Sequence, residues 1–414
     1  MKRFTIFLAG MALSVASMAQ QALWDKASAV SPVENPDGSV TFNLFAPEAK
    51  KVEVTGDFNQ TSPVTLPMTK NDKGMWTATT SQLAPELYSY SFNVDGMRVT
   101  DPSNAYMNRD ITTYSSLFII SKEKGDRGSL YSVNDVPHGT VAKVWYDSPT
   151  LGMKRRLTVY TPAGYSTEKQ YPVMYLMHGM GGDENAWSEL GRAAQILDNL
   201  IASGKATPMI VVMPNGNTNC SAAPGEWSAG MYIPGHYTIK TKAKASMEES
   251  FMDIVSFTDS NYSTIKRREG RAVCGLSMGG GHTFGISMLY PDTFDYYGLF
   301  SAAPWIKGNR DLKDFAARLR ADKETCGRLQ KLFDSRPKLY WIAIGKDDFL
   351  YGPNKDLRQY FDEKGYKYEY YENDGGHIWR NWRIYLSMYA QMIFKDMKLP
   401  YRVSAREQRA HAGI

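Results

Sequence analysis

The sequence is poor in cysteine, in net charge and in long apolar runs. Its three cysteines are too few for a disulfide framework, although Cys220 and Cys326 could pair with each other in an oxidising compartment. No group of cysteines and histidines has zinc-ligand spacing, so we expect no metal site. The formal net charge of +5 over 414 residues does not favour nucleic acid as a partner. No apolar run is long enough to span a bilayer, so we expect no membrane insertion.

The first 19 residues have the pattern of a secretory signal peptide. Lys2 and Arg3 form a basic start, residues 4–15 form an apolar stretch, and residues 17–19 (Ser-Met-Ala) offer a cleavage site with small residues at both ends. This pattern predicts a signal peptide over residues 1–19 and a periplasmic or secreted mature protein.

Residues 20–122 predict a small all-β domain. Short alternating segments at 40–45, 52–55, 76–79 and 88–94 are separated by turn sequences such as Asn-Pro-Asp-Gly at 35–38. This spacing is typical of a β-sandwich.

The motifs of this region resemble the immunoglobulin-like amino-terminal domain of isoamylases and glycogen branching enzymes. They are FAPEA at 45–49, VEV at 52–54, GDFN at 56–59, Trp76, and YSY at 88–90. The resemblance implies a domain of the kind classed among carbohydrate-binding modules. Trp76 and Tyr90 could either form a platform for a sugar or pack in the core.

The rest of the chain predicts an α/β unit. Residues 123–139 are polar and contain glycine, which suggests a linker or a covering loop, and residues 399–414 form a tail. Between them, over residues 140–398, apolar runs at 173–177, 209–213, 271–276 and 339–344 alternate with helical patterns such as 186–202 and 356–364. This alternation predicts a mostly parallel sheet with helices on both faces, preceded by two antiparallel edge strands at 141–146 and 156–160.

A glycine-flanked serine follows one of these strands. Ser277 lies at the centre of Gly275-x-Ser277-x-Gly279, and a helical segment follows. This is the pattern of a nucleophile elbow, in which a sharp strand-to-helix turn exposes the serine hydroxyl. The backbone N–H of Met278, directly after the serine, is placed to bind an oxyanion.

A second glycine-rich turn, HGMGGD at 178–183, follows the strand at 173–177. We expect the backbone N–H of Met180 to complete an oxyanion hole with that of Met278. The alternative is an ordinary strand-to-helix loop in which His178 packs structurally.

Two further loops supply the other residues of a serine hydrolase. Asp347 and Asp348 follow the strand at 339–344, and either carboxylate could orient a histidine. His377 lies between two glycines and the last helical pattern, where it can act as general base. The order serine, aspartate, histidine is the chain order of α/β-hydrolases.

Residues 140–398 as a whole resemble the esterase-D-like branch of α/β-hydrolases, particularly feruloyl and acetyl-xylan esterases. The matching motifs are HGMGG at 178–182, GLSMGG at 275–280, GKDDFLY at 345–351 and GHIW at 376–379. The resemblance implies an α/β-hydrolase fold after an immunoglobulin-like β-sandwich, and it favours Asp348 over Asp347 as the acid. Siderophore esterases of the enterochelin type share the same architecture.

These patterns together predict a secreted serine esterase without a cofactor. Its expected substrates are feruloyl or acetyl esters on polysaccharides or oligosaccharides such as xylan. Asn185, Trp227 and Trp379 are candidates for the substrate pocket, or equally for structural packing. The alternatives are a siderophore ester hydrolase and a non-catalytic polysaccharide-binding protein.

Overall fold

The computed structural model describes residues 29–59, 62–231, 243–306, 312–395, 397 and 399–400. The predicted signal peptide and nearly all of the predicted tail lie outside these residues. Within them, no helix combines the length and the apolar character needed to cross a membrane.

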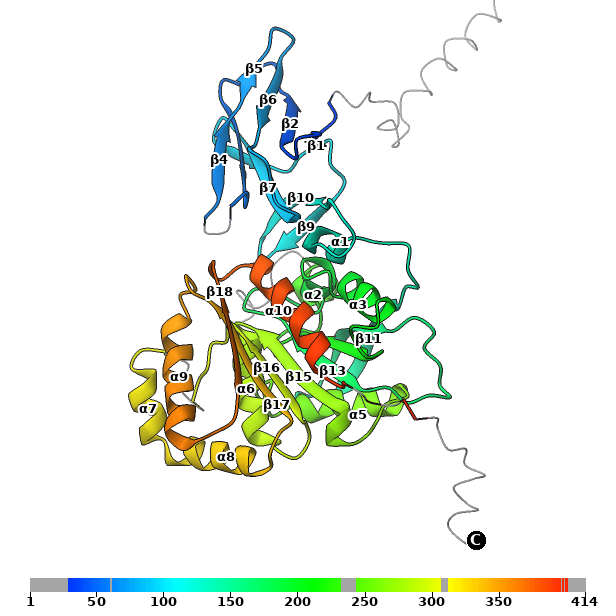
Figure 1. Ribbon diagram of the computed structural model, residues 1–414, viewed down its shortest axis with the longest axis vertical. Helices are drawn as coiled ribbons and strands as arrows, with labels where there is room; N and C mark the ends of the chain where they lie inside the picture. The colour runs from blue at the N-terminus through cyan, green and yellow to red at the C-terminus, as the bar shows by residue number, and fades with distance from the viewer. Residues whose placement is uncertain are drawn as a thin grey trace, which may run out of the picture.

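Two antiparallel sheets form the amino-terminal domain at the top of Figure 1. One sheet has the order β1-β2-β6-β5 (Val33–Glu34, Val40–Phe45, Met75–Thr79, Thr69–Lys70). The other has the order β4-β3-β7-β10-β9 (Val64–Pro67, Val52–Gly56, Glu86–Val94, Thr113–Ile120, Met107–Asp110), with β8 (Met97–Val99) also on β7. Trp76 and Tyr90 are both buried in the core of this domain, so they pack structurally and offer no sugar platform.

Residues 123–139, which follow this domain, are folded and packed against both domains. Residues 127–131 form helix α1 (Arg127–Tyr131), whose amino end is capped by the Asp126 carboxylate through the Ser129 N–H. Tyr131 is buried in the same apolar cluster as residues of both domains. Of the two expectations for residues 123–139, the structure therefore favours a covering segment packed between the domains.

An eight-stranded sheet forms the centre of the second domain. Its order is β11-β12-β14-β13-β15-β16-β17-β18 (Thr140–Ser148, Met153–Thr161, Ile210–Pro214, Val173–Met177, Arg271–Leu276, Tyr296–Phe300, Leu339–Gly345, Glu369–Asn373). The first two strands pair antiparallel, β12 pairs antiparallel with β14, and all later pairs are parallel. The predicted edge strands and mostly parallel sheet are confirmed.

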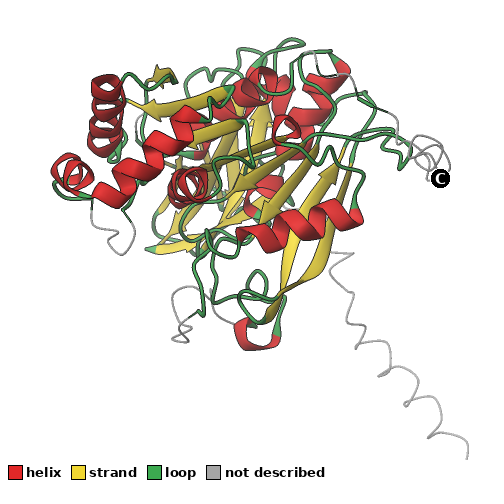
Figure 2. Cartoon of the chain, turned by 90° about the horizontal axis from the view of Figure 1, so that it is seen from below, coloured by secondary structure: helices red, strands yellow, loops and turns green. Residues whose placement is uncertain are grey.

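Helices cover both faces of this sheet, as the view in Figure 2 shows. Along β13, Met174 and Leu176 face one apolar cluster, and Val173, Tyr175 and Met177 face the other. The first cluster is completed by α2, α3 and α10 (Ala186–Glu189, Ala193–Ala202, Trp379–Met392), and the second by α5, α6, α7, α8 and α9 (Phe251–Asn261, Met278–Leu289, Phe315–Ala321, Lys323–Asp334, Tyr351–Lys364). Short 3₁₀ turns lie at Ser228–Gly230 and Arg268–Gly270.

Helix α10 joins the two domains. Arg380 donates hydrogen bonds to the backbone oxygens of Asp57 and Asn59, and Arg383 donates to those of Leu87 and Leu190. The apolar cluster beneath them combines residues of β7, β10, α1, α3 and α10, namely Leu87, Leu117, Tyr131, Leu197, Trp382 and Leu386. Because α10 begins directly after the loop that carries His377, the contact between the domains also supports that loop.

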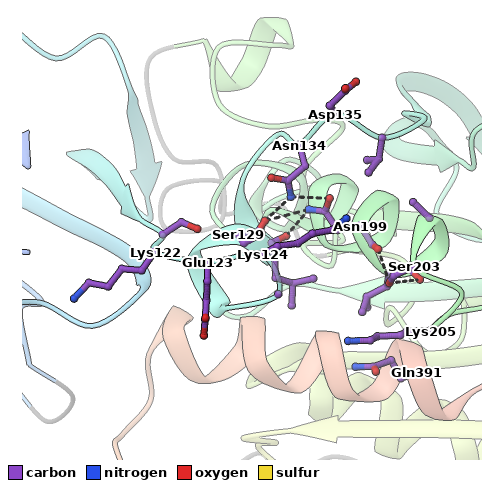
Figure 3. A pocket seen from close by; sticks show the side chains of 16 residues that line it. Lys122, Glu123, Lys124, Ser129, Asn134, Asp135, Asn199, Ser203, Lys205 and Gln391 are labelled. Carbon is purple, nitrogen blue, oxygen red and sulfur yellow. Dashed lines mark hydrogen bonds between the residues drawn. The ribbon is translucent and has the colours of Figure 1, made fainter.

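A cavity of about 850 Å³ lies where the covering segment crosses α3 (Figure 3). The Asn134 amide donates to the backbone oxygen of Ser129 and to the side chain of Asn199, which fixes the segment over the helix. None of the predicted catalytic residues lines this cavity. The three cysteines are all free, so Cys220 and Cys326 form no disulfide here.

Candidate active site

Ser277 lies on a strained turn between β15 and α6. Its backbone has φ +53° and ψ −113°, in the left-handed half of conformational space that side chains rarely occupy. The turn is closely packed, since a Cβ atom on Gly275 would lie 2.7 Å from the Met177 carbonyl oxygen and one on Gly279 would lie 2.5 Å from it. Both glycines are therefore required sterically, and the geometry has the features expected of a nucleophile elbow.

The glycine-rich loop after β13 lies against this turn. A Cβ atom on Gly179 would approach the Ser277 Cβ to 3.2 Å, so the loop passes directly beside the serine. Met180, whose N–H is the predicted oxyanion donor, follows Gly179, and its side chain is 67% exposed. The Met278 N–H is the first of α6, where the positive end of the helix favours a developing negative charge.

The side chain of His178 fixes the position of the glycine-rich loop after β13. Its Nε2 accepts a hydrogen bond from the Gly216 N–H at 2.8 Å, and its Nδ1 lies 2.7 Å from the Gly179 carbonyl oxygen. An N–H donor at Nε2 requires a lone pair there, so the proton is on Nδ1 and the ring is neutral. His178 therefore has a structural function, which is one of the two alternatives that the sequence leaves open.

Asp348 and His377 form a close pair at the same edge of the sheet. His377 Nδ1 lies 3.0 Å from Oδ1 and 2.9 Å from Oδ2 of Asp348, whose side chain is fully buried. Asp347 is exposed and accepts instead from the Gly375 N–H at 3.2 Å. Of the two aspartates, Asp348 is thus the one that contacts the histidine, and His377 Nε2 is the nitrogen left for a proton from a nucleophile.

Comparison with known proteins identifies the family. Residues 148–390 match the Esterase family, and residues 30–106 match carbohydrate-binding module 48, the isoamylase N-terminal domain. The chain belongs to the Esterase family. Both resemblances drawn from the sequence motifs are thereby confirmed.

Two relatives have names that bear on the substrate. The chain is 30% identical over 372 residues to "Endo-1,4-beta-xylanase/feruloyl esterase" of Xylanibacter ruminicola, covering 88% of this chain and 46% of that protein. It is 27% identical over 158 residues to "Acetyl esterase" of Caldicellulosiruptor saccharolyticus, covering 33% of this chain and 58% of that protein. The chain thus spans about half the length of the first relative.

Solved structures agree with the fold. The feruloyl esterase module from Clostridium thermocellum matches 67% of this chain and 95% of its own, with 21% identity and a TM-score of 0.51. The enterobactin esterase from Shigella flexneri matches 87% of this chain and 94% of its own, with 15% identity and a TM-score of 0.59. These likenesses confirm the predicted α/β-hydrolase fold.

The three pocket candidates of this esterase lie in different settings. Trp379 packs edge-on against Trp187 and Trp382 at 5.3 and 5.2 Å, and Trp382 in turn packs edge-on against His377 at 4.9 Å. Asn185 is buried before α2 in the loop that also carries Met180. Trp227 directly precedes a 3₁₀ turn and packs on Gly230 of that turn.

Sequence reasoning missed the polar residues that hold the loop after β13. Glu184 is fully buried and accepts from Arg156 at 2.7 Å, from Asn215 at 2.9 Å and from the Ala223 N–H at 2.8 Å. Burial raises the pKa of Glu184, and its hydrogen bonds oppose that shift. No local signal in the sequence distinguishes Glu184, because Asp183 and Asn185 on either side of it are polar as well.

The amino-terminal domain also reaches this loop. Arg109, at the end of β9, forms an ion pair with the buried Asp183, and the side chain of Ile111 would contact a Cβ atom on Gly181 at 2.7 Å. Asp110, between them, accepts a hydrogen bond from the Trp379 side chain. The β9–β10 hairpin therefore borders the candidate active site, which no motif in the sequence indicated.

Proposed function

We propose that this protein is a secreted serine esterase that hydrolyses feruloyl or acetyl esters on plant cell-wall polysaccharide such as xylan. The observation that carries the proposal is the contact between His377 and the buried Asp348, at the same sheet edge as the strained Ser277. The names of the two relatives, a xylanase/feruloyl esterase and an acetyl esterase, support the substrate class.

In the proposed reaction Ser277 attacks the ester carbonyl carbon and His377 Nε2 takes the hydroxyl proton. Asp348 fixes the proton of His377 on Nδ1 and stabilises the imidazolium that forms. The N–H groups of Met180 and Met278 bind the oxyanion of the tetrahedral intermediate. His377 then returns the proton to the alcohol oxygen, the alcohol leaves, and a water molecule releases the acid by the same steps in reverse.

The test is a comparison of the wild type with Ser277→Ala on methyl ferulate, acetylated xylan and feruloylated xylo-oligosaccharides. We expect the wild type to release ferulate or acetate and the variant to lose at least about 10³-fold in kcat. Ester cleavage retained by Ser277→Ala would contradict the mechanism. An enterochelin-type trilactone cleaved faster than every xylan ester would contradict the substrate class, and binding to xylan without any hydrolysis would identify a non-catalytic protein.

A further inference from the structure

A second histidine–carboxylate pair lies buried beside the candidate active site. His282, on α6, has a side chain that is 2% exposed, and its Nδ1 lies 2.7 Å from Oε1 of Glu248. Burial alone would raise the pKa of Glu248, but the positive charge of His282 and the hydrogen bond to it lower that pKa to about 2. Glu248 is thus ionised, and Nδ1 of His282 donates to it.

The other nitrogen of His282 faces a small cavity. Among the described residues Nε2 has no hydrogen-bond partner, and the same holds for the buried Oδ1 of Asn219. Both residues line a cavity of about 150 Å³ whose other lining residues are Gly216, Asn217, Thr218, Ser246, Met247 and Met278. This volume corresponds to about five water molecules, and two unpartnered polar atoms in one cavity indicate a polar occupant.

The cavity lies beside the residue that follows the nucleophile. Met278 and His282 are four residues apart on α6, so they lie on one face of the helix, about 6 Å apart along its axis. The cavity therefore lies along the first turn of α6, directly after the nucleophile.

The position of the cavity indicates which part of an ester it receives. Its remaining residues come from the segments after β14 and before α5, whereas His377 follows β18, on the other side of β15 in the sheet. The alcohol oxygen must lie next to His377 to receive its proton. The acyl group is then directed to the opposite side of β15, which is the side on which the cavity lies.

We propose that this cavity is an acyl-group subsite in which His282, held by Glu248, binds a hydroxyl group on an aromatic acyl chain. A hydroxyl is the matching group because it donates to Nε2 when the ring is neutral and accepts from it when the ring is protonated. When Nε2 is protonated and donates, the single proton of the hydroxyl is free for the side-chain oxygen of Asn219. The inference rests on the proposed esterase function and narrows its substrates to hydroxylated acyl esters.

Gly216 allows a test that leaves His282 in place. A Cβ atom on Gly216 would lie 3.5 Å from Nε2 of His282 and 3.3 Å from Cε of Met278, so Gly216→Ala puts a methyl group where the hydroxyl would bind. His282→Gln is the second variant, since it keeps a donor for Glu248 but moves the group that faces the cavity. His138→Gln is the matched control, because His138 pairs with Asp198 at 3.1 Å and does not line the cavity.

The readout is the ratio of kcat/KM for the methyl esters of 3- or 4-hydroxycinnamic acid to that for methyl cinnamate. We expect a wild-type ratio of about ten or more, the worth of one buried hydrogen bond. Gly216→Ala and His282→Gln should bring it close to one, and His138→Gln should leave it unchanged. A wild-type ratio near one, or an unchanged ratio in both cavity variants, would overturn the proposal.

Two further measurements distinguish a failure of the acyl-subsite proposal from a failure of the proposed esterase function. Hydrolysis of 4-nitrophenyl acetate reports on the catalytic residues alone. Binding of free 4-hydroxycinnamate and cinnamate to Ser277→Ala, by calorimetry, needs no turnover; equal dissociation constants would mean that the cavity holds only water. If the cavity variants instead change the preference for feruloyl-arabinose over methyl ferulate, the hydroxyl belongs to the sugar and the acyl assignment is wrong.

Discussion

Replacing Asp348 by asparagine should lower kcat for ester hydrolysis by about 10³–10⁴-fold without unfolding the protein. Loss of the charge alone removes a charge-assisted hydrogen bond worth about 1.5–3 kcal/mol, which is about 10–150-fold. The structure indicates that the loss is larger. The Leu350 N–H donates to Oδ1 of Asp348 at 2.9 Å, so an asparagine keeps its oxygen at that position.

The amide nitrogen of this asparagine then replaces Oδ2, which lies 2.9 Å from His377 Nδ1. This N–H group would face a proton on Nδ1, so the substitution favours the tautomer with the imidazole proton on Nε2, although Oδ1 also lies 3.0 Å from Nδ1. In this tautomer His377 cannot take the proton of Ser277. The carboxylate that holds the His377 ring in position is lost as well.

The matched control is Asp347→Asn, one residue earlier on an exposed turn. Its carboxylate is exposed and accepts a 3.2 Å hydrogen bond from the Gly375 N–H, so kcat should stay within about threefold of the wild type. The assay is steady-state hydrolysis of methyl ferulate, with circular dichroism and melting temperature to verify folding. A larger loss in Asp347→Asn than in Asp348→Asn would refute the reasoning.

Three further predictions concern buried charges. Glu184→Gln should destabilise the fold by about 3 kcal/mol, because Arg156 loses its buried carboxylate and keeps the half-exposed Glu226; an unchanged denaturation midpoint would contradict this. Arg383→Met should cost a similar amount, since Glu86 and two backbone oxygens lose a buried donor, and chemical denaturation measures it. Glu248→Gln tests a pH dependence of stability. The pKa of Glu248 is lowered from 4.5 to about 2 in the folded protein. Its ionised form therefore stabilises the fold above pH 4.5, and this contribution is lost as the pH falls toward 2. The variant should therefore be less stable than the wild type by about 3 kcal/mol near neutral pH and equal to it near pH 2, whereas a difference that persists in acid would argue against the paired state.

The parts of the site that the sequence predicts are those set by local geometry. The elbow follows from Gly275 and Gly279, because only glycine fits within 2.7 Å of the Met177 carbonyl oxygen. The choice between Asp347 and Asp348 came from a family resemblance, since both follow the same strand. In the structure the turn after β17 exposes the first and buries the second against His377.

The parts that the sequence does not predict depend on partners far apart in the chain. Glu184 and Arg156 are 28 residues apart, and Glu248 and His282 are 34 residues apart. Such pairs have no motif, because the sheet order rather than the spacing brings them together. Tyr131 is a similar case, since its burial depends on α3 and on β7, while the segment 123–139 that carries it consists mostly of polar residues and glycine.

The contact between Arg109 and Asp183 leads us to predict an effect of the amino-terminal domain on catalysis. Asp183 belongs to the loop that carries Met180, and Arg109 is the residue of the β9–β10 hairpin that neutralises it. If the hairpin positions the loop, Arg109→Gln should lower kcat about tenfold even on the small ester 4-nitrophenyl acetate, because a displaced N–H no longer meets the oxyanion. Arg98→Gln, in the same domain but bonded to Ser115, is the matched control and should have no effect. If the domain served only to capture polysaccharide, Arg109→Gln would slow the hydrolysis of xylan esters and leave the small ester unaffected, which would contradict a role in positioning the loop.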